Sequence, residues 1–361
     1  GLLSLLMMFM VITMVSCQRD TYEIALITDV GTIDDKSFNQ GAWEGVVEYA
    51  EENDISHEYY QPAEKTTPAY IDAIELAIEN GAEIVVTPGY LFENAIWSVQ
   101  SEYPEVKFIL LDGSPHNVVD WDTMATLEGS GAPDFTIEDN VLSIFYAEEE
   151  SGFLAGYAAV KNGHTKLGYM GGVGVPAVIR FGIGFIQGAD YAAVENNVDV
   201  TVQYKHLGNF AALPEHKTLA SSWYNSGTQL IFVAAGAAIN NVISAAEEST
   251  GKFVMGANVD QQDLSNTILT SALKRLKESV YQVLEAYYAG NFQGGQTLNL
   301  TASENGVGLT DDFSRYQTFT KAQYDAVYQK LVNGTINVIA SHTIDIATGL
   351  PLTRTTVILE D

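Results

Sequence analysis

Short runs of apolar residues recur along the chain, and a stretch with helical spacing follows most of them. The runs show little polar alternation, which is typical of strands buried on both faces. Between two runs, Tyr70, Ile74 and Ile78 follow the period of a helix, and Asn80-Gly81 is a helix stop signal. The predicted strands are EIALIT (23–28), HEYYQ (57–61), EIVVTPG (83–89), KFILLDG (107–113), LSIFYA (142–147), KLGYMGG (166–172), LIFVAAG (230–236) and KFVMGAN (252–258).

This alternation of strands and helices predicts an α/β protein with parallel sheets and crossover helices. The segment 116–140 interrupts the rhythm, because it is rich in Asp, Gly, Ser and Pro. Two doubly wound halves joined near this segment fit the length better than one sheet. Ligands of such sheets bind at the carboxyl ends of the strands. The residues at those ends are polar or glycine: Asp29, Gly89, Asp112, Gly171, Gly236 and Asp260.

Length and composition indicate a globular chain of two domains. The 361 residues are 47% hydrophobic and 17% charged, which excludes large-scale disorder. The 46 Asp and Glu residues outnumber the 17 Lys and Arg residues, so the net charge is −29. Such a surface repels phosphate backbones and discourages self-association. We therefore expect a monomer that binds no nucleic acid.

Catalytic and metal motifs do not stand out in the sequence. Cys17 is the only cysteine, and the six histidines show no metal-helix spacing. The Gly172-x-Gly174-x-x-Ala177 pattern carries Pro176 inside its loop and lacks a following acidic residue for a ribose, so it does not indicate a nicotinamide or flavin site. The acidic run at 148–150 is interpreted as the first turn of a helix. We expect a binding protein without metal, cofactor or enzymatic activity.

The N-terminal residues resemble a bacterial lipoprotein signal. Residues 2–15 form an apolar or hydroxyl run that is too short to span a bilayer but matches the core of an export signal. Met14-Val15-Ser16-Cys17 resembles a lipobox, which implies removal of residues 1–16 and diacylation of Cys17. Two acyl chains give stable anchoring. The mature protein is expected on the extracytoplasmic face of the cell membrane.

The densest polar segment, 29–45, follows the first predicted strand and precedes a helix. Within it, Asp34, Asp35 or Ser37 could cap that helix. Capping uses one or two such residues and does not account for all of them. The segment is therefore predicted to bind a ligand.

ITDVGTIDDKSFNQGAWEG (27–45) resembles the opening signature of the basic membrane lipoprotein (BMP) family, and the resemblance continues along nearly the whole mature chain. It implies a type I periplasmic-binding-protein fold, with two doubly wound α/β lobes joined by a hinge of three crossing segments. Lobe one is placed at 22–146 plus 264–298, and lobe two at 147–263 plus 299–361. The other matching segments are VTPGY (86–90), FILLDG (108–113), ESGFLAGYAAV (150–160), KLGYMGGVGVPAVIRFGIGFIQGADYA (166–192), LIFVAAG (230–236), VMGANVDQ (254–261), ILTSALKRLKESVY (268–281) and NGVGL (305–309).

The resemblance implies a site for a purine nucleoside such as inosine, guanosine or adenosine. Phe38 and Phe181 are expected to sandwich the purine, one from each lobe. The other implied contacts are Asp29, Asp34, Ser37 and Asn39 to the base edge, Asp112 and Asp260 to the ribose hydroxyls, Gly236 through its backbone, and Lys274 as a cation beside the ligand or a carboxylate.

The implied partners are the permease and ATPase subunits of an ABC importer. Three alternatives remain open from the sequence. The same fold could bind a sugar, an autoinducer or another small metabolite, or the protein could be an enzyme that processes nucleosides. The protein could also be a surface protein that contacts host molecules or regulates rather than transports.

Overall fold

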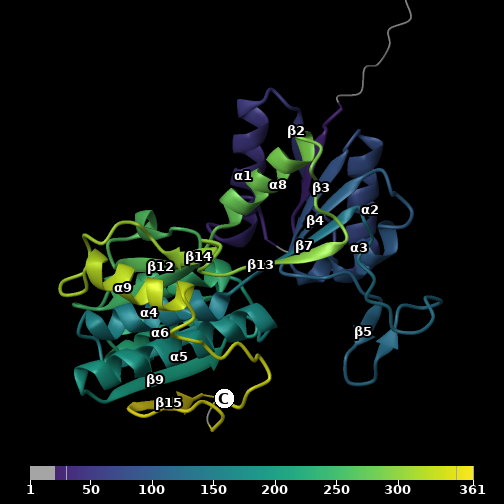
Figure 1. The fold of residues 1–361 in the computed structure, drawn as a ribbon. Coiled ribbons are helices and arrows are strands. Elements are labelled where there is room, and N and C mark those ends of the chain that lie inside the picture. The colour runs from purple at the N-terminus through teal and green to yellow at the C-terminus, as the bar shows by residue number, and fades with distance from the viewer. Residues whose placement is uncertain (1–20, 30, 347, 361) are drawn as a thin grey trace, which may run out of the picture.

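The computed structural model describes residues 21–29, 31–346 and 348–360, which form two lobes (Figure 1). Each lobe is a mainly parallel sheet with helices on both faces. We call the lobe built on the six-stranded sheet the first lobe and the lobe built on the seven-stranded sheet the second lobe. The predicted signal segment, 1–16, and the predicted lipidation site, Cys17, lie outside the described residues.

The first lobe is an all-parallel sheet between two helical layers. Apolar residues of both faces are buried, because Ile24 and Leu26 pack in the cluster of α1 whereas Ala25 and Ile27 pack in that of α2 and α3. In sheet order the strands are β13 (Gln296–Leu300), β7 (Val141–Tyr146), β4 (Lys107–Leu111), β3 (Ile84–Pro88), β1 (Ile24–Ile27) and β2 (His57–Tyr60). The helices are α1 (Phe38–Glu52) and α8 (Leu276–Tyr288) on one face, and α2 (Thr67–Glu79) and α3 (Glu93–Val99) on the other.

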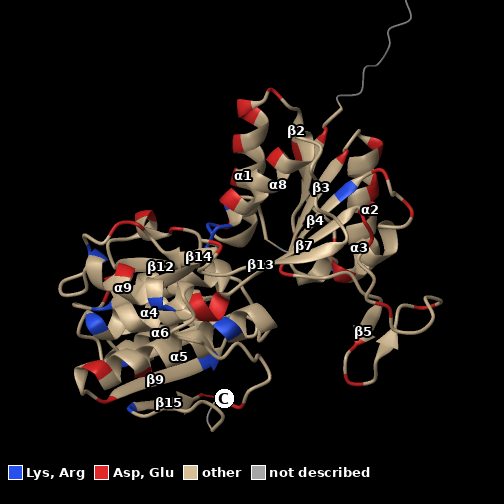
Figure 2. Ribbon diagram, viewed as in Figure 1, with Lys and Arg blue, Asp and Glu red and all other residues tan. Residues whose placement is uncertain are grey.

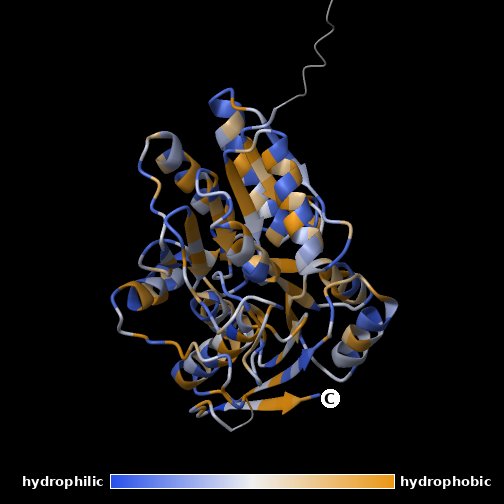
Figure 3. Ribbon diagram, turned by 90° about the vertical axis from the view of Figure 1, so that its right-hand side faces the viewer, coloured by the Kyte–Doolittle hydropathy of each residue, from blue (hydrophilic) through white to orange (hydrophobic). Residues whose placement is uncertain are grey.

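The second lobe repeats this plan with an antiparallel strand at one edge. In sheet order the strands are β14 (Val307–Leu309, antiparallel), β12 (Ile268–Lys274), β11 (Phe253–Asn258), β10 (Leu230–Ala234), β8 (Lys166–Gly171), β9 (Val200–His206) and β15 (Thr355–Leu359). The helices are α4 (Glu148–Lys161), α5 (Pro176–Asn196) and α9 (Lys321–Val332) on one face, and α6 (Pro214–Asn225) and α7 (Ile239–Glu247) on the other. Figure 3 shows apolar strands inside and mixed polarity on the helices.

All eight predicted strands are present, and the helix predicted from Tyr70 to Ile78 is α2. Its stop signal acts as expected, because Asn80 is the C-cap and Gly81 has a φ of 101°, a conformation that favours glycine. The segment 116–140, which breaks the rhythm, carries a small hairpin of β5 (Val118–Asp120) and β6 (Ala125–Thr126) that projects from the first lobe.

The chain crosses between the lobes after β7, β12 and β13. Residues 264–298 were predicted to belong to lobe one, but β12 lies in the second sheet. This strand is fully buried between β11 and β14 of the second sheet, so the chain returns to the first lobe only after Lys274, at α8.

The first turn of α4 touches the other two crossings. Ser151 Oγ donates to the carbonyls of Leu273 (3.1 Å) and Gly308 (3.0 Å), beside the second crossing. Glu150 accepts from the Ala302 amide at 2.6 Å, next to the third. The three crossing segments are thus tied together at one helix end.

Helices α4 and α5 pack backbone to backbone through one pair of glycines on each helix, Gly152 and Gly156 of α4 and Gly184 and Gly188 of α5. A Cβ on Gly156 would lie 2.0 Å from the Phe185 carbonyl oxygen, and one on Gly188 would lie 1.9 Å from that of Phe153. Real side chains do not reach such distances, so glycine is required where these helices touch. This close contact fixes how α5 presents its first turns to the rest of the lobe.

Candidate functional site

The polar loop after β1 is organised around two aspartates. The Asp35 carboxylate accepts from the backbone amides of Ser37 (2.8 Å), Asn39 (3.1 Å) and Gln40 (3.1 Å), so Asp35 supplies the cap of α1. Asp29 Oδ1 accepts from the Asn39 side-chain amide at 2.8 Å and from the Gly31 amide at 2.8 Å. Capping therefore uses Asp35, while Asp29 and Asn39 pair at the strand end.

The same loop contacts the second lobe. Asn258, at the end of β11, donates to Ser37 Oγ at 2.9 Å, and the Gln261 side chain donates to the Lys36 carbonyl at 2.7 Å. Ser37 was predicted as a site residue from the sequence, whereas Asn258 and Gln261 were not. These bonds bring the carboxyl ends of strands from both sheets close together.

Lys274, the last residue of β12, lies at the centre of the site. Its side chain is 2% exposed, and its ammonium pairs with Asp112 and with Glu148 Oε1 at 2.8 Å. The ammonium also lies over the rings of Phe38 (4.9 Å to the centroid), Tyr146 (5.5 Å) and Phe181 (5.6 Å). Four predicted residues, Phe38, Asp112, Phe181 and Lys274, are thus brought together.

The ion pairs around Lys274 continue into the second lobe. Glu148 is fully buried, and its second oxygen accepts from Arg180 Nε at 2.6 Å. Burial alone would raise the pKa of Glu148, but attraction to Lys274 and Arg180 outweighs it and holds that pKa below its usual value. The acidic run does form the first turn of α4, but Glu148 was not predicted as a site residue, because its partners are distant in sequence.

Asp112 has one oxygen without a partner. Burial raises its pKa to about 6, although the neighbouring Lys274 lowers it. Lys274 takes Oδ2, whereas Oδ1 is buried and has no hydrogen-bond partner among the described residues. A buried carboxylate oxygen left unpaired is costly, so Oδ1 is suited to accept a hydrogen bond from a ligand.

The aromatic residues of the second lobe differ from the predicted arrangement. Phe181 is 2% exposed and packs edge-on against Phe232, with 5.8 Å between the centroids, so it is a core residue below the site. Phe210 was not predicted. It is partly buried over the ends of β8 and β10, where a Cβ on Gly172 would lie 2.2 Å from its ring and Gly236 has a φ of 53°.

Two predicted residues are more exposed than this centre. Asp34 is exposed and accepts from the Thr32 hydroxyl, and Asp260 is exposed and accepts from the Gln262 amide at 2.9 Å. Within the described ranges, no group of three or more His, Cys, Asp or Glu residues could hold a metal ion.

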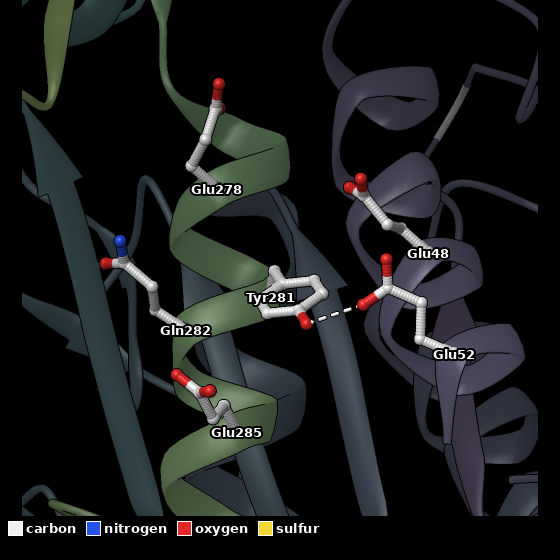
Figure 4. A pocket seen from close by; sticks show the side chains of 6 residues that line it. All are labelled: Glu48, Glu52, Glu278, Tyr281, Gln282 and Glu285. Carbon is white, nitrogen blue, oxygen red and sulfur yellow. Dashed lines mark hydrogen bonds between the residues drawn. The ribbon is translucent and has the colours of Figure 1, made fainter. Parts of the chain in front are cut away.

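A surface hollow of about 400 Å³ lies between α1 and α8, away from the strand ends (Figure 4). The Tyr281 hydroxyl donates to Glu52 across it at 2.7 Å. Figure 2 shows that Asp and Glu positions are spread along the helices and loops of both lobes. The lining residues are Glu48, Glu52, Glu278, Tyr281, Gln282 and Glu285.

Residues 23–342 match the family of PnrA-like ABC transporter substrate-binding proteins. The chain belongs to this family. It is 30% identical to the CD4+ T-cell-stimulating antigen of Listeria monocytogenes, covering 88% of both chains. It is 29% identical to basic membrane protein A1 of Borrelia garinii subsp. bavariensis, covering 92% of this chain and 94% of the relative.

A third relative and a solved structure extend these similarities. The ABC transporter nucleoside-binding protein BmpA of Lactococcus lactis is 27% identical, over 79% of this chain and 80% of the relative. A solute-binding protein from Aeropyrum pernix shares the fold with a TM-score of 0.72 at 23% identity, over 89% and 94% of the two chains. The predicted periplasmic-binding-protein fold is thereby confirmed.

Family membership makes the chain a substrate-binding protein of an ABC transporter and not an enzyme. Its partners are therefore a small-molecule ligand and a permease. In the part of the chain that the structure describes, no helix is both long and apolar enough to cross a bilayer.

Proposed function

We propose that this protein captures a purine nucleoside between its two lobes and delivers it to an ABC importer. The observation that carries the proposal is the unpartnered, buried Oδ1 of Asp112 beside Lys274 and the Phe38 ring. A ribose hydroxyl can donate to this oxygen while a base stacks on the neighbouring ring. The relative named as a nucleoside-binding protein supports the same ligand class.

Phe38 and Phe210 are the proposed stacking rings. Phe210 replaces Phe181 in this role, because the buried Phe181 ring has no face free for a base. Asp29, Ser37 and Asn39 are proposed to meet the base edge, whereas the exposed Asp34 and Asp260 can join only when the lobes close further over a ligand. The backbone of Gly236 lies against Phe210 and keeps its proposed contact.

Calorimetric titration of the purified protein with inosine, guanosine and adenosine tests the proposal. Saturable heat is expected with at least one of them and none with ribose alone, because stacking supplies roughly 1–3 kcal/mol per aromatic contact. Phe38→Ala and Phe210→Ala should each weaken binding by that amount, whereas Phe135→Ala, on the projecting loop, should not. Absence of heat with every nucleoside would exclude this ligand class.

The affinity for the nucleoside is expected to fall at acidic pH. The raised pKa of Asp112, about 6, means that one carboxylate in about eleven is ionised at pH 5, whereas nearly all are at pH 7.5. A ligand hydroxyl needs the ionised oxygen, so the dissociation constant should be about tenfold higher at pH 5. Titrations at both pH values measure this ratio, and an unchanged constant would remove Asp112 from the contacts.

We also propose that Cys17 carries a lipid anchor that holds the protein, as a monomer, on the extracytoplasmic face of the membrane. The lipobox-like Met14-Val15-Ser16-Cys17 supports this proposal. Fractionation of cells that produce Cys17→Ser should find the protein released from the membrane. Retention of that variant in the membrane fraction would contradict the anchor.

A further inference from the structure

We propose that Glu148 is a positioning residue of the ligand site, which holds the Lys274 ammonium on one oxygen of Asp112 and leaves the other oxygen for a ligand hydroxyl. The role toward the ligand rests on the proposed function, whereas the ion pairs themselves do not. Glu148 is the first residue of α4 and directly follows the first crossing, so it lies where the chain passes from the first lobe to the second, beside the site.

The geometry sets what Glu148 can do. Its two oxygens point to different cations, with Oε1 2.8 Å from Lys274 Nζ and Oε2 2.6 Å from Arg180 Nε. Lys274 is therefore held between a carboxylate of each lobe, Asp112 after β4 and Glu148 on α4. An ammonium held by Glu148 in this way is expected to stay on Asp112 Oδ2 and to leave Oδ1 uncovered.

Arg180 completes the arrangement from α5. It lies 3.8 Å from Glu149 as well as against Glu148, and its side chain is largely buried. Two cations thus face Glu148, and the resulting row Arg180–Glu148–Lys274–Asp112 runs from the second lobe to the first. Alternating signs along the row stabilise each charge in a site from which water is largely excluded.

Two members of the row, Glu148 and Arg180, shift the pKa of Asp112 in opposite directions. Glu148 is a second negative charge and raises the pKa of Asp112, whereas Arg180 lowers it. Substitutions of Glu148 and of Arg180 should therefore shift, in opposite directions, the pH below which the ligand affinity falls. Among the described residues, the charged or titratable groups that act on this carboxylate are Lys274 of β12, Glu148 of α4, Arg180 of α5 and Tyr146 of β7. Glu93 of α3 lies beside the adjacent Gly113, and Glu149 faces Glu148 and Arg180.

The experiment compares the ratio of the inosine dissociation constants at pH 5 and pH 7.5 in matched variants. The ratio cancels any pH-independent loss of affinity. It should be about tenfold in the unmodified protein, below tenfold in Glu148→Gln and above tenfold in Arg180→Gln. Glu150→Gln, in the same helical turn but bonded to Ala302, should keep the unmodified ratio. Equal ratios in all four proteins would overturn the proposal.

A measurement without ligand separates this proposal from the nucleoside assignment. The ¹³C carboxyl resonance of Asp112, identified by its loss in Asp112→Asn, reports the pKa of that group directly. Titration should give a lower midpoint in Glu148→Gln and a higher midpoint in Arg180→Gln. If inosine binds to none of the proteins but the midpoints shift as expected, the ligand is wrong and the ion row stands. Unshifted midpoints contradict the row, and either variant alone suffices if the other does not fold.

Discussion

Lys274→Met is expected to lower the free energy of unfolding by about 3–5 kcal/mol at neutral pH, because it leaves two buried carboxylates without their shared cation. Asp112 and Glu148 both pair with this ammonium, and Glu148 is fully buried. The Met side chain keeps most of the apolar stem, so the loss reports charge rather than volume. Denaturant unfolding at pH 7.5 measures it.

Lys277→Met is the matched control for this prediction. Lys277 lies one residue into α8 after the same crossing, is 43% exposed and pairs with the exposed Glu48 at 2.8 Å. A surface pair of this kind contributes about 0–1 kcal/mol. Comparable losses in the two variants would show that the buried row does not depend on its central cation. Lower pH should reduce the difference. The pKa of Asp112, about 6 with Lys274 present, lies higher in the variant, so protonation there removes one of the two uncompensated charges.

Gly188→Ala is expected to destabilise the protein by about 1–3 kcal/mol, against the trend of helix propensity. In a solvent-exposed helix, Ala is about 1 kcal/mol better than Gly. Here the added Cβ would lie 1.9 Å from the Phe153 carbonyl oxygen of α4, so the two helices must move apart and lose their packing. Thermal and denaturant unfolding of the variant measure the loss.

An exposed position on the same helix provides the comparison. Val194 of α5 is 47% exposed, and Val194→Ala should change the free energy of unfolding by no more than about 0.5 kcal/mol. If Gly188→Ala proved as stable as the unmodified protein, α4 and α5 would be able to separate at little cost. The close glycine contact would then not fix the orientation of α5.

Seven of the eight strands that the sequence predicted have continuous apolar runs, and HEYYQ (57–61) is the exception. The strands that were missed have other patterns. β9 alternates buried and more exposed residues, because it lies beside the edge strand β15. β12 carries Thr270, Ser271 and Lys274 although it is fully buried. The Thr270 hydroxyl is hydrogen-bonded to the Thr310 hydroxyl at 2.7 Å, and Ser271 Oγ accepts from the backbone amide of Gln261 at 3.0 Å. The sequence pattern of this strand is polar because its polar residues find their hydrogen-bond partners elsewhere in the chain, and these partners cannot be recognised from the pattern.

The site was predicted best where its residues follow one another along the chain. Asp29 and Asn39 belong to one loop, and their pairing agrees with the polar density of that loop. Phe181 is buried against Phe232, and the direction in which its ring points depends on how α5 docks on α4, which the sequence pattern does not reveal. Phe210 gave no signal of its own, since its position is recognised only from the glycines beneath it in the folded chain.

The contact between α1 and α8 also sets an order of events during synthesis. Tyr49 of α1 packs against Tyr281 and Tyr288 of α8, and the edge strand β13 follows α8. A nascent chain that has emerged only as far as β7 therefore has five strands of the first sheet but neither the helix that covers α1 nor its last strand. Strands β8 to β12 of the second sheet are synthesised between β7 and α8. The first lobe therefore begins before the second lobe but is completed only after most of the second lobe has been synthesised.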